Sequence, residues 1–125
     1  MQPDAFHDRL DAVRRRFASS LEYKIKDTLA ELPNLTGDGE AVVDAVAVSY
    51  RRIHGICGVG AAVGFAVTGR AARDVEDVLI DAYRARRGLE FDEVARLKAT
   101  LDALSAAAEA ELRSVSTPAT SKNEE

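Results

Sequence analysis

The sequence predicts an all-α protein, an up-down antiparallel bundle of four helices. Apolar residues recur in steps of three and four through most of the 125-residue chain, the spacing of amphipathic helices. No comparable stretch alternates apolar and polar residues as a half-buried strand would. The connections between the predicted helices are short, which makes sequential helices antiparallel neighbours.

The first helix is predicted over about residues 4–32. Asp4 is a suitable N-cap, and Pro33 with the following Asn34 and Gly37 ends the segment. A break near 18–20 would divide it into a short N-terminal lead helix and a longer second one. One face carries the apolar or small positions Phe6, Leu10, Val13, Phe17, Leu21, Ile25, Thr28 and Leu32.

The second helix is predicted over about residues 38–63, with Asp38 or Thr36 as its cap. Gly64 and the pair Thr68-Gly69 mark a turn or kink after it. Its apolar stripe consists of Val42, Val46, Tyr50, Ile53, Ile56, Gly60 and Val63.

The third helix is predicted over about residues 67–87, with Gly88 at its C-terminal end. Its inward positions are Ala71, Val75, Val78 and Ala82, whereas Glu76, Asp77 and Asp81 are interpreted as a charged, solvated face. Arginines 84, 86 and 87 lie in the last turn, where cations favour the helix dipole.

The fourth helix is predicted over about residues 90–115, with acidic residues in its first turn. Its apolar register runs through Phe91, Val94, Leu97, Leu101, Leu104, Ala108 and Leu112. Residues 116–125 are polar and include Pro118, so we expect a disordered tail after a helical domain of residues 1–115.

The composition excludes several classes of function. The net charge is −4, and the basic cluster of residues 14–16 is balanced by nearby acidic residues, so we expect no nucleic-acid binding. One cysteine excludes an internal disulfide and fits a reducing compartment. With no apolar signal region and no run of about 18 apolar residues, the expectation is a cytoplasmic protein without a membrane segment.

His54 is the candidate functional residue. At about 100° per residue it falls roughly 130° from the centre of its helix's apolar stripe, so its side chain is expected to reach solvent. Gly58 and Arg51 share this side, because residues three and four apart lie on one helix face. The neighbouring alanines at 47, 61 and 62 leave the surface with little bulk, as a partner closing over a nucleophile would need. This favours phosphoryl relay through His54.

The stretch from His54 to Phe65 resembles a histidine-containing phosphotransfer (HPt) domain of two-component signalling. The matching positions are the histidine, a glycine four residues later, a small residue and a Gly-Phe pair: His54, Gly58, Ala61, Gly64 and Phe65. Residues 71–76 resemble the alanine-rich run that opens the family's next helix and ends in a hydrophobic-glutamate pair. Two departures are Cys57, where many members have lysine, and Gly55 directly after the histidine.

The resemblance implies that His54 accepts a phosphoryl group from a phospho-aspartate of a response-regulator receiver domain and passes it to another receiver. A hybrid histidine kinase would be a further partner. The receiver would supply the aspartate, Mg²⁺ and lysine, so the chain would be a phosphocarrier without cofactor, metal site or kinase activity of its own. Arg51 and Arg73 are candidates for stabilising the phosphoryl oxygens. Gly58, Ala61, Gly64 and Phe65 are candidates for the docking surface or its supporting edge.

Other interpretations stay open at this point. The chain could be a helical adaptor that binds a receiver or another signalling protein without being phosphorylated. It could also be the dimerisation and phosphoacceptor part of a sensor kinase. His54 and Cys57 could bind a soft metal, but two ligands without a third make a poor site. Gly60 is interpreted as a packing glycine, and His7 as a surface residue.

Overall fold

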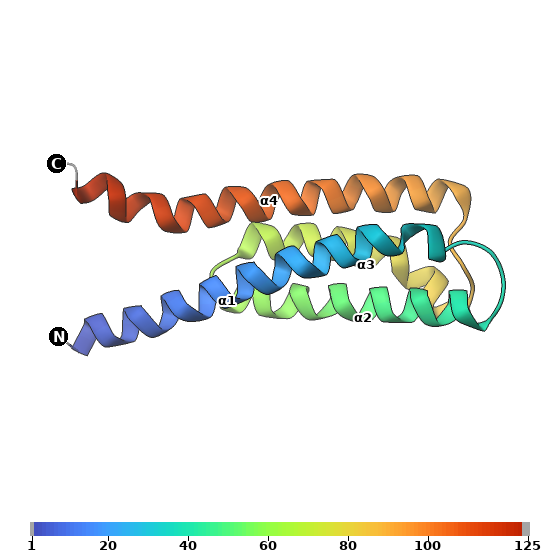
Figure 1. Ribbon diagram of the computed structural model, residues 1–125, viewed down its shortest axis with the longest axis horizontal. Helices are drawn as coiled ribbons and strands as arrows, with labels where there is room; N and C mark the ends of the chain where they lie inside the picture. The colour runs from blue at the N-terminus through green and yellow to red at the C-terminus, as the bar shows by residue number, and fades with distance from the viewer. Residues whose placement is uncertain (1, 124–125) are drawn as a thin grey trace.

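The computed structural model describes the backbone of residues 2–123 and the side chains of residues 8–114. Its elements are α1 (Gln2–Glu31), the short 3-10 helix η1 (Leu32–Asn34), α2 (Glu40–Ala62), α3 (Ala66–Ala85) and α4 (Phe91–Asn123). Successive helices run in opposite directions, and both ends of the chain lie at the same end of the molecule (Figure 1). α2 packs on α3, α3 on α4, and α1 on both α2 and α4. The predicted up-down four-helix bundle is confirmed.

One helix interior and two helix ends differ from the sequence prediction. α1 is continuous across residues 18–20, so no separate lead helix forms. The N-cap of α2 is Gly39, without a side-chain cap, rather than Asp38 or Thr36. α3 ends at Ala85, and its C-cap is Arg86 in the left-handed conformation (φ 55°) rather than Gly88. Gly88 is needed for close approach instead, because a Cβ there would lie 2.7 Å from the Gly37 carbonyl oxygen.

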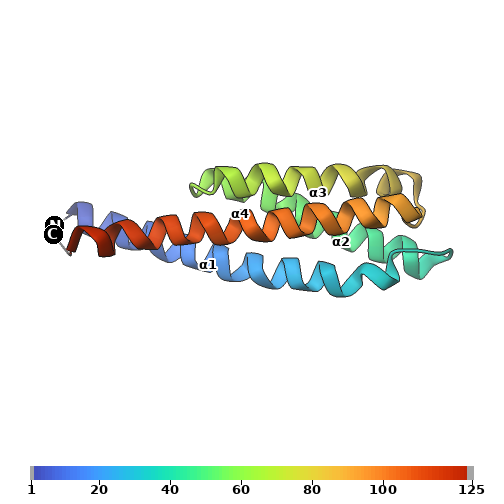
Figure 2. The ribbon, with the colours of Figure 1, turned by 90° about the horizontal axis from the view of Figure 1, so that it is seen from above.

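The core follows the predicted apolar stripes with a few exceptions at helix ends. Its fully buried large side chains come from every helix and include Leu21, Val46, Ile53, Ile56, Val75, Leu79, Leu97, Leu101 and Leu104. Phe91 was expected in register but is 94% exposed, because it is the first residue of α4. Val13 and Leu112 are also exposed (37% each), since α1 and α4 extend past the turn between α2 and α3 (Figure 2).

α2 and α3 cross closely at a pair of glycines. A Cβ on Gly60 would lie 3.3 Å from the Gly69 Cα and 3.2 Å from the Phe65 carbonyl oxygen. A Cβ on Gly69 would lie 3.4 Å from the Cys57 carbonyl oxygen. Gly60 is therefore a packing glycine, as the sequence predicts.

The outer helices hold the turn between α2 and α3. Gly64 provides the positive φ (92°) of the turn, and Arg14 of α1 donates from Nε to the carbonyl oxygen of Val63 at 2.9 Å. Glu111 of α4 accepts hydrogen bonds from the backbone N–H and the hydroxyl of Thr68 at 2.7 and 2.6 Å. These contacts satisfy backbone groups that the last turn of α2 and the first turn of α3 leave unpaired.

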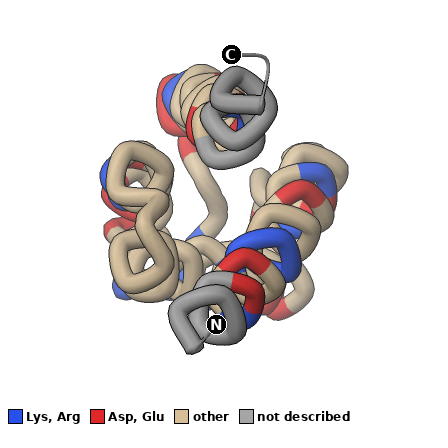
Figure 3. The backbone as a smooth tube through the Cα atoms, turned by 90° about the vertical axis from the view of Figure 1, so that its left-hand side faces the viewer, with Lys and Arg blue, Asp and Glu red and all other residues tan. Residues whose placement is uncertain are grey.

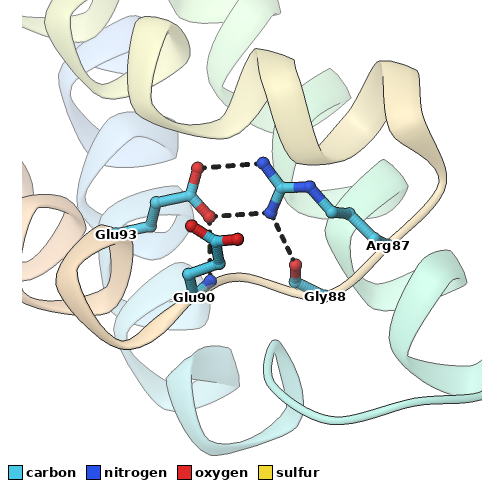
Figure 4. Close-up of polar contacts among 4 residues, drawn as sticks. All are labelled: Arg87, Gly88, Glu90 and Glu93. Carbon is cyan, nitrogen blue, oxygen red and sulfur yellow. Dashed lines mark hydrogen bonds and ion pairs between the residues drawn. The ribbon is translucent and has the colours of Figure 1, made fainter.

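A charged cluster fixes the connection from α3 to α4 (Figure 4). The Arg87 guanidinium donates to both carboxylate oxygens of Glu93, at 2.8 and 3.2 Å, and also to the Gly88 carbonyl. Glu93 Oε1 accepts the backbone N–H of Glu90 at 2.8 Å. The hydrogen bond from Arg87, against the opposing effect of burial, holds the pKa of Glu93 below its usual value.

The backbone of α4 is helical through Asn123, which includes most of the segment expected to be a disordered tail. The side chains beyond Ser114 lie outside the described residues, as does that of His7, so the division into a domain of residues 1–115 and a tail stays a prediction. Within the described part of the chain, none of the helices combines the length and the apolar character needed to cross a membrane.

Candidate functional site

His54 lies in the third quarter of α2 with its imidazole on the surface. The side chain is 64% exposed, whereas its neighbours Ile53 and Ile56 are buried in the core. The helical spacing of the stripe therefore places the ring outside the bundle, as expected from the sequence.

The imidazole is nevertheless anchored on one edge by a buried carboxylate. Nδ1 of His54 lies 2.6 Å from Oε2 of Glu76, which projects from α3 and is only 8% exposed. An ionised carboxylate only accepts hydrogen bonds, so Nδ1 is the protonated nitrogen of the neutral ring. Nε2, on the other edge, has no hydrogen-bond partner among the described residues. Its lone pair is therefore available to solvent or to a partner.

Glu76 stays ionised although it is buried. Burial raises the pKa of a carboxyl group, but here hydrogen bonds from His54, Cys57 and Tyr50 outweigh it and leave the pKa of Glu76 below its usual value. Oε1 accepts from the Cys57 Sγ at 3.3 Å. The carboxylate is thus held by two donors from α2, His54 and Cys57, of which only the imidazole is exposed.

Cys57 cannot act as a nucleophile in this arrangement. Its sulfur donates to the Glu76 carboxylate rather than to the imidazole, and a thiolate formed there would be buried beside a negative charge. Burial, followed by the hydrogen bond to Glu76, raises the pKa of the Cys57 thiol to about 12. Cys57 therefore points inward and is neutral.

A stack of aromatic rings supports the histidine from the N-terminal side of α2. The Tyr50 ring stacks on the His54 ring, with centroids 5.7 Å apart, and on the Tyr83 ring of α3, at 4.2 Å. Burial and the hydrogen bond to Glu76 raise the pKa of Tyr50. Tyr50 therefore remains neutral beside Glu76 at any physiological pH.

The surface on the C-terminal side of His54 is bare, and residues 53–69 bring no charged side chain to it. A Cβ on Gly55 or on Gly58 would meet no other atom within 4 Å, so neither glycine is required by packing inside the chain. Residues 53–69 contain no lysine, arginine, aspartate or glutamate, and the near end of the α2–α3 hairpin in Figure 3 carries neither charge colour. Val59 and Val67 are about half exposed there. A partner can approach this face without displacing side chains.

The structure separates the other predicted site residues into two groups. Arg51, Gly58, Ala61 and Arg73 are exposed, and neither arginine forms an ion pair among the residues whose side chains are described. Gly64 lies in the turn, and Phe65 is fully buried against Phe17. Phe65 can therefore support the face only from inside the core.

Glu76 is the site residue that sequence reasoning missed. Together with Asp77 and Asp81 it was interpreted as part of a charged, solvated face, which is wrong for Glu76. The available signal was its angular position, because Glu76 falls within the inward arc of α3 formed by Ala72, Val75 and Leu79. A glutamate inside an apolar stripe requires polar partners from a neighbouring helix.

Among the residues whose side chains are described, no three histidine, cysteine, aspartate or glutamate residues form a group that could hold a metal ion. A scan against protein-family models and searches of the curated proteins and of the solved structures found no match to this chain. The features that indicate a function are therefore the geometry around His54 and the resemblance in sequence.

Proposed function

We propose that this protein is a phosphorelay intermediate of two-component signalling, an HPt domain that carries a phosphoryl group on His54 between phospho-aspartate receiver domains. The observation that supports this most is the pairing of an exposed imidazole with the buried Glu76 carboxylate at 2.6 Å. The pairing leaves Nε2 as the free nucleophile on a bare helical face.

In the proposed reaction the lone pair of Nε2 attacks the phosphorus of a receiver's phospho-aspartate. The new N–P bond forms as the acyl phosphate P–O bond breaks, and the aspartate leaves as a carboxylate. The ring, still protonated at Nδ1, gains positive charge, which the adjacent Glu76 carboxylate stabilises. Transfer to a second receiver is the reverse of these steps. Mg²⁺ belongs to the receiver domain in this scheme, and the chain itself needs no cofactor.

The face around Gly55 and Gly58 would be the docking surface. A receiver must bring its aspartate within bonding distance of Nε2, and a side chain projecting one turn from His54 would obstruct it. The exposed valines 59 and 67 offer apolar area at the same end of the hairpin. Arg51 and Arg73, both exposed, are the proposed sources of positive charge for the phosphoryl oxygens, because Cys57 points inward.

The remaining features of the proposal follow from this role. The partners would be response-regulator receiver domains and a hybrid histidine kinase, in the cytoplasm, with no nucleic acid and no membrane. The protein would have no kinase activity by itself. Its contribution to catalysis is to present one nitrogen in a fixed orientation.

The test is phosphoryl transfer from a panel of phosphorylated receiver domains with Mg²⁺. We expect acid-labile, alkali-stable phosphate on the wild-type chain and none on His54→Gln. His7→Gln is the matched control, because it removes the chain's other histidine and should leave the label unchanged.

A second variant tests the docking surface. Gly58→Leu adds bulk where the structure offers open space, so we expect unchanged helicity and a loss of labelling. Receivers that bind the wild-type chain without labelling it would overturn the relay and leave the alternative, a helical adaptor.

A further inference from the structure

The carboxylate of Glu76 forms a bridge between His54 and Cys57. Oε2 accepts from Nδ1 of the imidazole at 2.6 Å, and Oε1 lies 3.3 Å from the cysteine sulfur. The two donors come from successive turns of α2, and the acceptor comes from α3. Each oxygen of the carboxylate therefore has its own donor, which fixes the plane of the group as well as its position.

The Cys57 thiol has one hydrogen and two acceptors within reach. Sγ lies 3.6 Å from the Ile53 carbonyl oxygen and 3.3 Å from Glu76 Oε1. The ionised oxygen is the stronger acceptor and the nearer one. At neutral pH the sulfur keeps its proton, because the buried thiol has a pKa of about 12. Cys57 is thus a permanent donor to the carboxylate.

We propose that Cys57 is a positioning residue for phosphoryl transfer: its thiol holds the Glu76 carboxylate in the orientation in which Oε2 fixes the Nδ1–H tautomer of His54. The inference rests on the proposed function, since it concerns the reactivity of the same nitrogen. Without the thiol, Oε1 would lose its donor inside the bundle, and the carboxylate would gain freedom to rotate away from the imidazole.

Other groups that face the site limit how much the loss of the Cys57 thiol can change the tautomer of His54 and the transfer rate. Tyr50 of α2 is a second neutral group that lowers the pKa of Glu76. From α3, Arg73 adds positive potential near Cys57, and Arg84 adds it near Tyr50. Since these groups remain when the thiol is removed, the Nδ1–H tautomer and the transfer rate should be reduced and not abolished.

The experiment compares Cys57→Ala with Cys57→Ser, two side chains of similar size of which only serine retains a donor. The ¹⁵N chemical shifts of the His54 ring, recorded at about pH 8 where an ordinary imidazole is neutral, report the tautomer. Transfer rates from one receiver report reactivity.

We expect the wild-type ring to be mainly the Nδ1–H tautomer. In Cys57→Ala we expect a larger Nε2–H fraction and a transfer rate lower by about three- to tenfold, the range of one hydrogen bond. Cys57→Ser should recover the wild-type tautomer and a rate within about twofold of the wild type.

Equal tautomer fractions in wild type, Cys57→Ala and Cys57→Ser, with all three folded, would overturn the inference and make Cys57 a packing residue. Failure of the proposed function has a different signature. In that case no receiver labels the wild type, whereas the tautomer still depends on the donor at position 57.

Discussion

Two buried glutamates of this protein have nearly equal exposure and opposite surroundings. Glu93, at the α3–α4 connection, is 7% exposed and faces the permanent cation Arg87 (Figure 4). Glu76, between α2 and α3, is 8% exposed and faces the neutral groups Cys57 and Tyr50 together with an exposed imidazole. The charge of Glu93 is compensated within the fold. That of Glu76 is available to stabilise positive charge that develops on His54.

Burial of a carboxylate does not by itself indicate function. What distinguishes the site is the partner, because a guanidinium stays charged at every accessible pH and an imidazole changes its charge near neutrality. The two glutamates should therefore respond differently when their charge is removed.

The largest expected effect is on transfer in Glu76→Gln. An amide lacks the charge that stabilises the phosphorylated ring, so we expect phosphoryl transfer to His54 to fall by about a hundredfold, as for loss of one preorganised electrostatic partner. The free energy of unfolding should change by less than about 1 kcal/mol, because removing a buried charge offsets the weakened hydrogen bonds. Transfer kinetics and urea denaturation of the same sample measure both. A variant as active as the wild type would remove Glu76 from the site.

Glu93→Ala should lower the stability of the fold and leave phosphoryl transfer unchanged. It leaves Arg87 without its partner and the Glu90 N–H without its acceptor, so we expect a loss of about 2 kcal/mol in the free energy of unfolding. The loss is smaller than for a fully buried pair because the Arg87 side chain is 35% exposed. Transfer measured below the denaturation midpoint should be unchanged. Asp102→Ala, which breaks the exposed Lys98–Asp102 pair, is the control and should cost less than about 0.5 kcal/mol.

Acid should destabilise the fold through both of these glutamates, as it should through Glu111, whose pKa is also lowered by its hydrogen bonds from Thr68 and Val67 against the effect of burial. Glu76 and Glu93 both have a folded-state pKa below the usual value. Their contribution to stability is therefore complete above the unfolded-state pKa of about 4.3 and is lost as the pH falls through the folded-state values. Urea midpoints between about pH 7 and pH 3 should fall below about pH 4.5, and the fall should be shallower in Glu93→Gln. An equal slope in that variant would contradict the assignment.

The smallest effects distinguish glycines that pack from glycines that leave a surface open. Gly60→Ala places a Cβ 3.2–3.3 Å from backbone atoms at the helix crossing, and we expect a loss of about 1–2 kcal/mol. Gly58→Ala meets nothing and should stabilise α2 by up to about 1 kcal/mol through helix propensity. Thermal denaturation of both variants measures the difference, and shifts of the same sign would contradict it.

Periodicity predicted much of this structure. It gave the four helices, the buried stripe of α2 and the exposure of His54, because a helix packed along one stripe fixes the direction of every side chain on it. It failed at helix ends, where Phe91 is exposed and Arg86 rather than Gly88 forms the left-handed C-cap of α3. End geometry depends on tertiary contacts, such as the approach of Gly88 to Gly37, that spacing does not encode.

The site was predictable only in part for a related reason. His54 and its bare face follow from the pattern of a single helix. Glu76 and the inward hydrogen bond of Cys57 depend on how α3 is rotated against α2, and that rotation is set by the glycine crossing at Gly60 and Gly69. A pairing across two helices is a property of their packing and not of either sequence pattern alone.

The contacts of Arg14 and Glu111 with the turn at the end of the α2–α3 hairpin have a consequence for how the chain folds. They join residues 49 and 43 positions apart in the sequence, so the turn is completed only by segments from near opposite ends of the chain. The hairpin that presents His54 would lack these backbone partners as an isolated fragment. A truncation that removes α1 or α4 should therefore disorder the surface around His54, although neither helix contributes a residue to it.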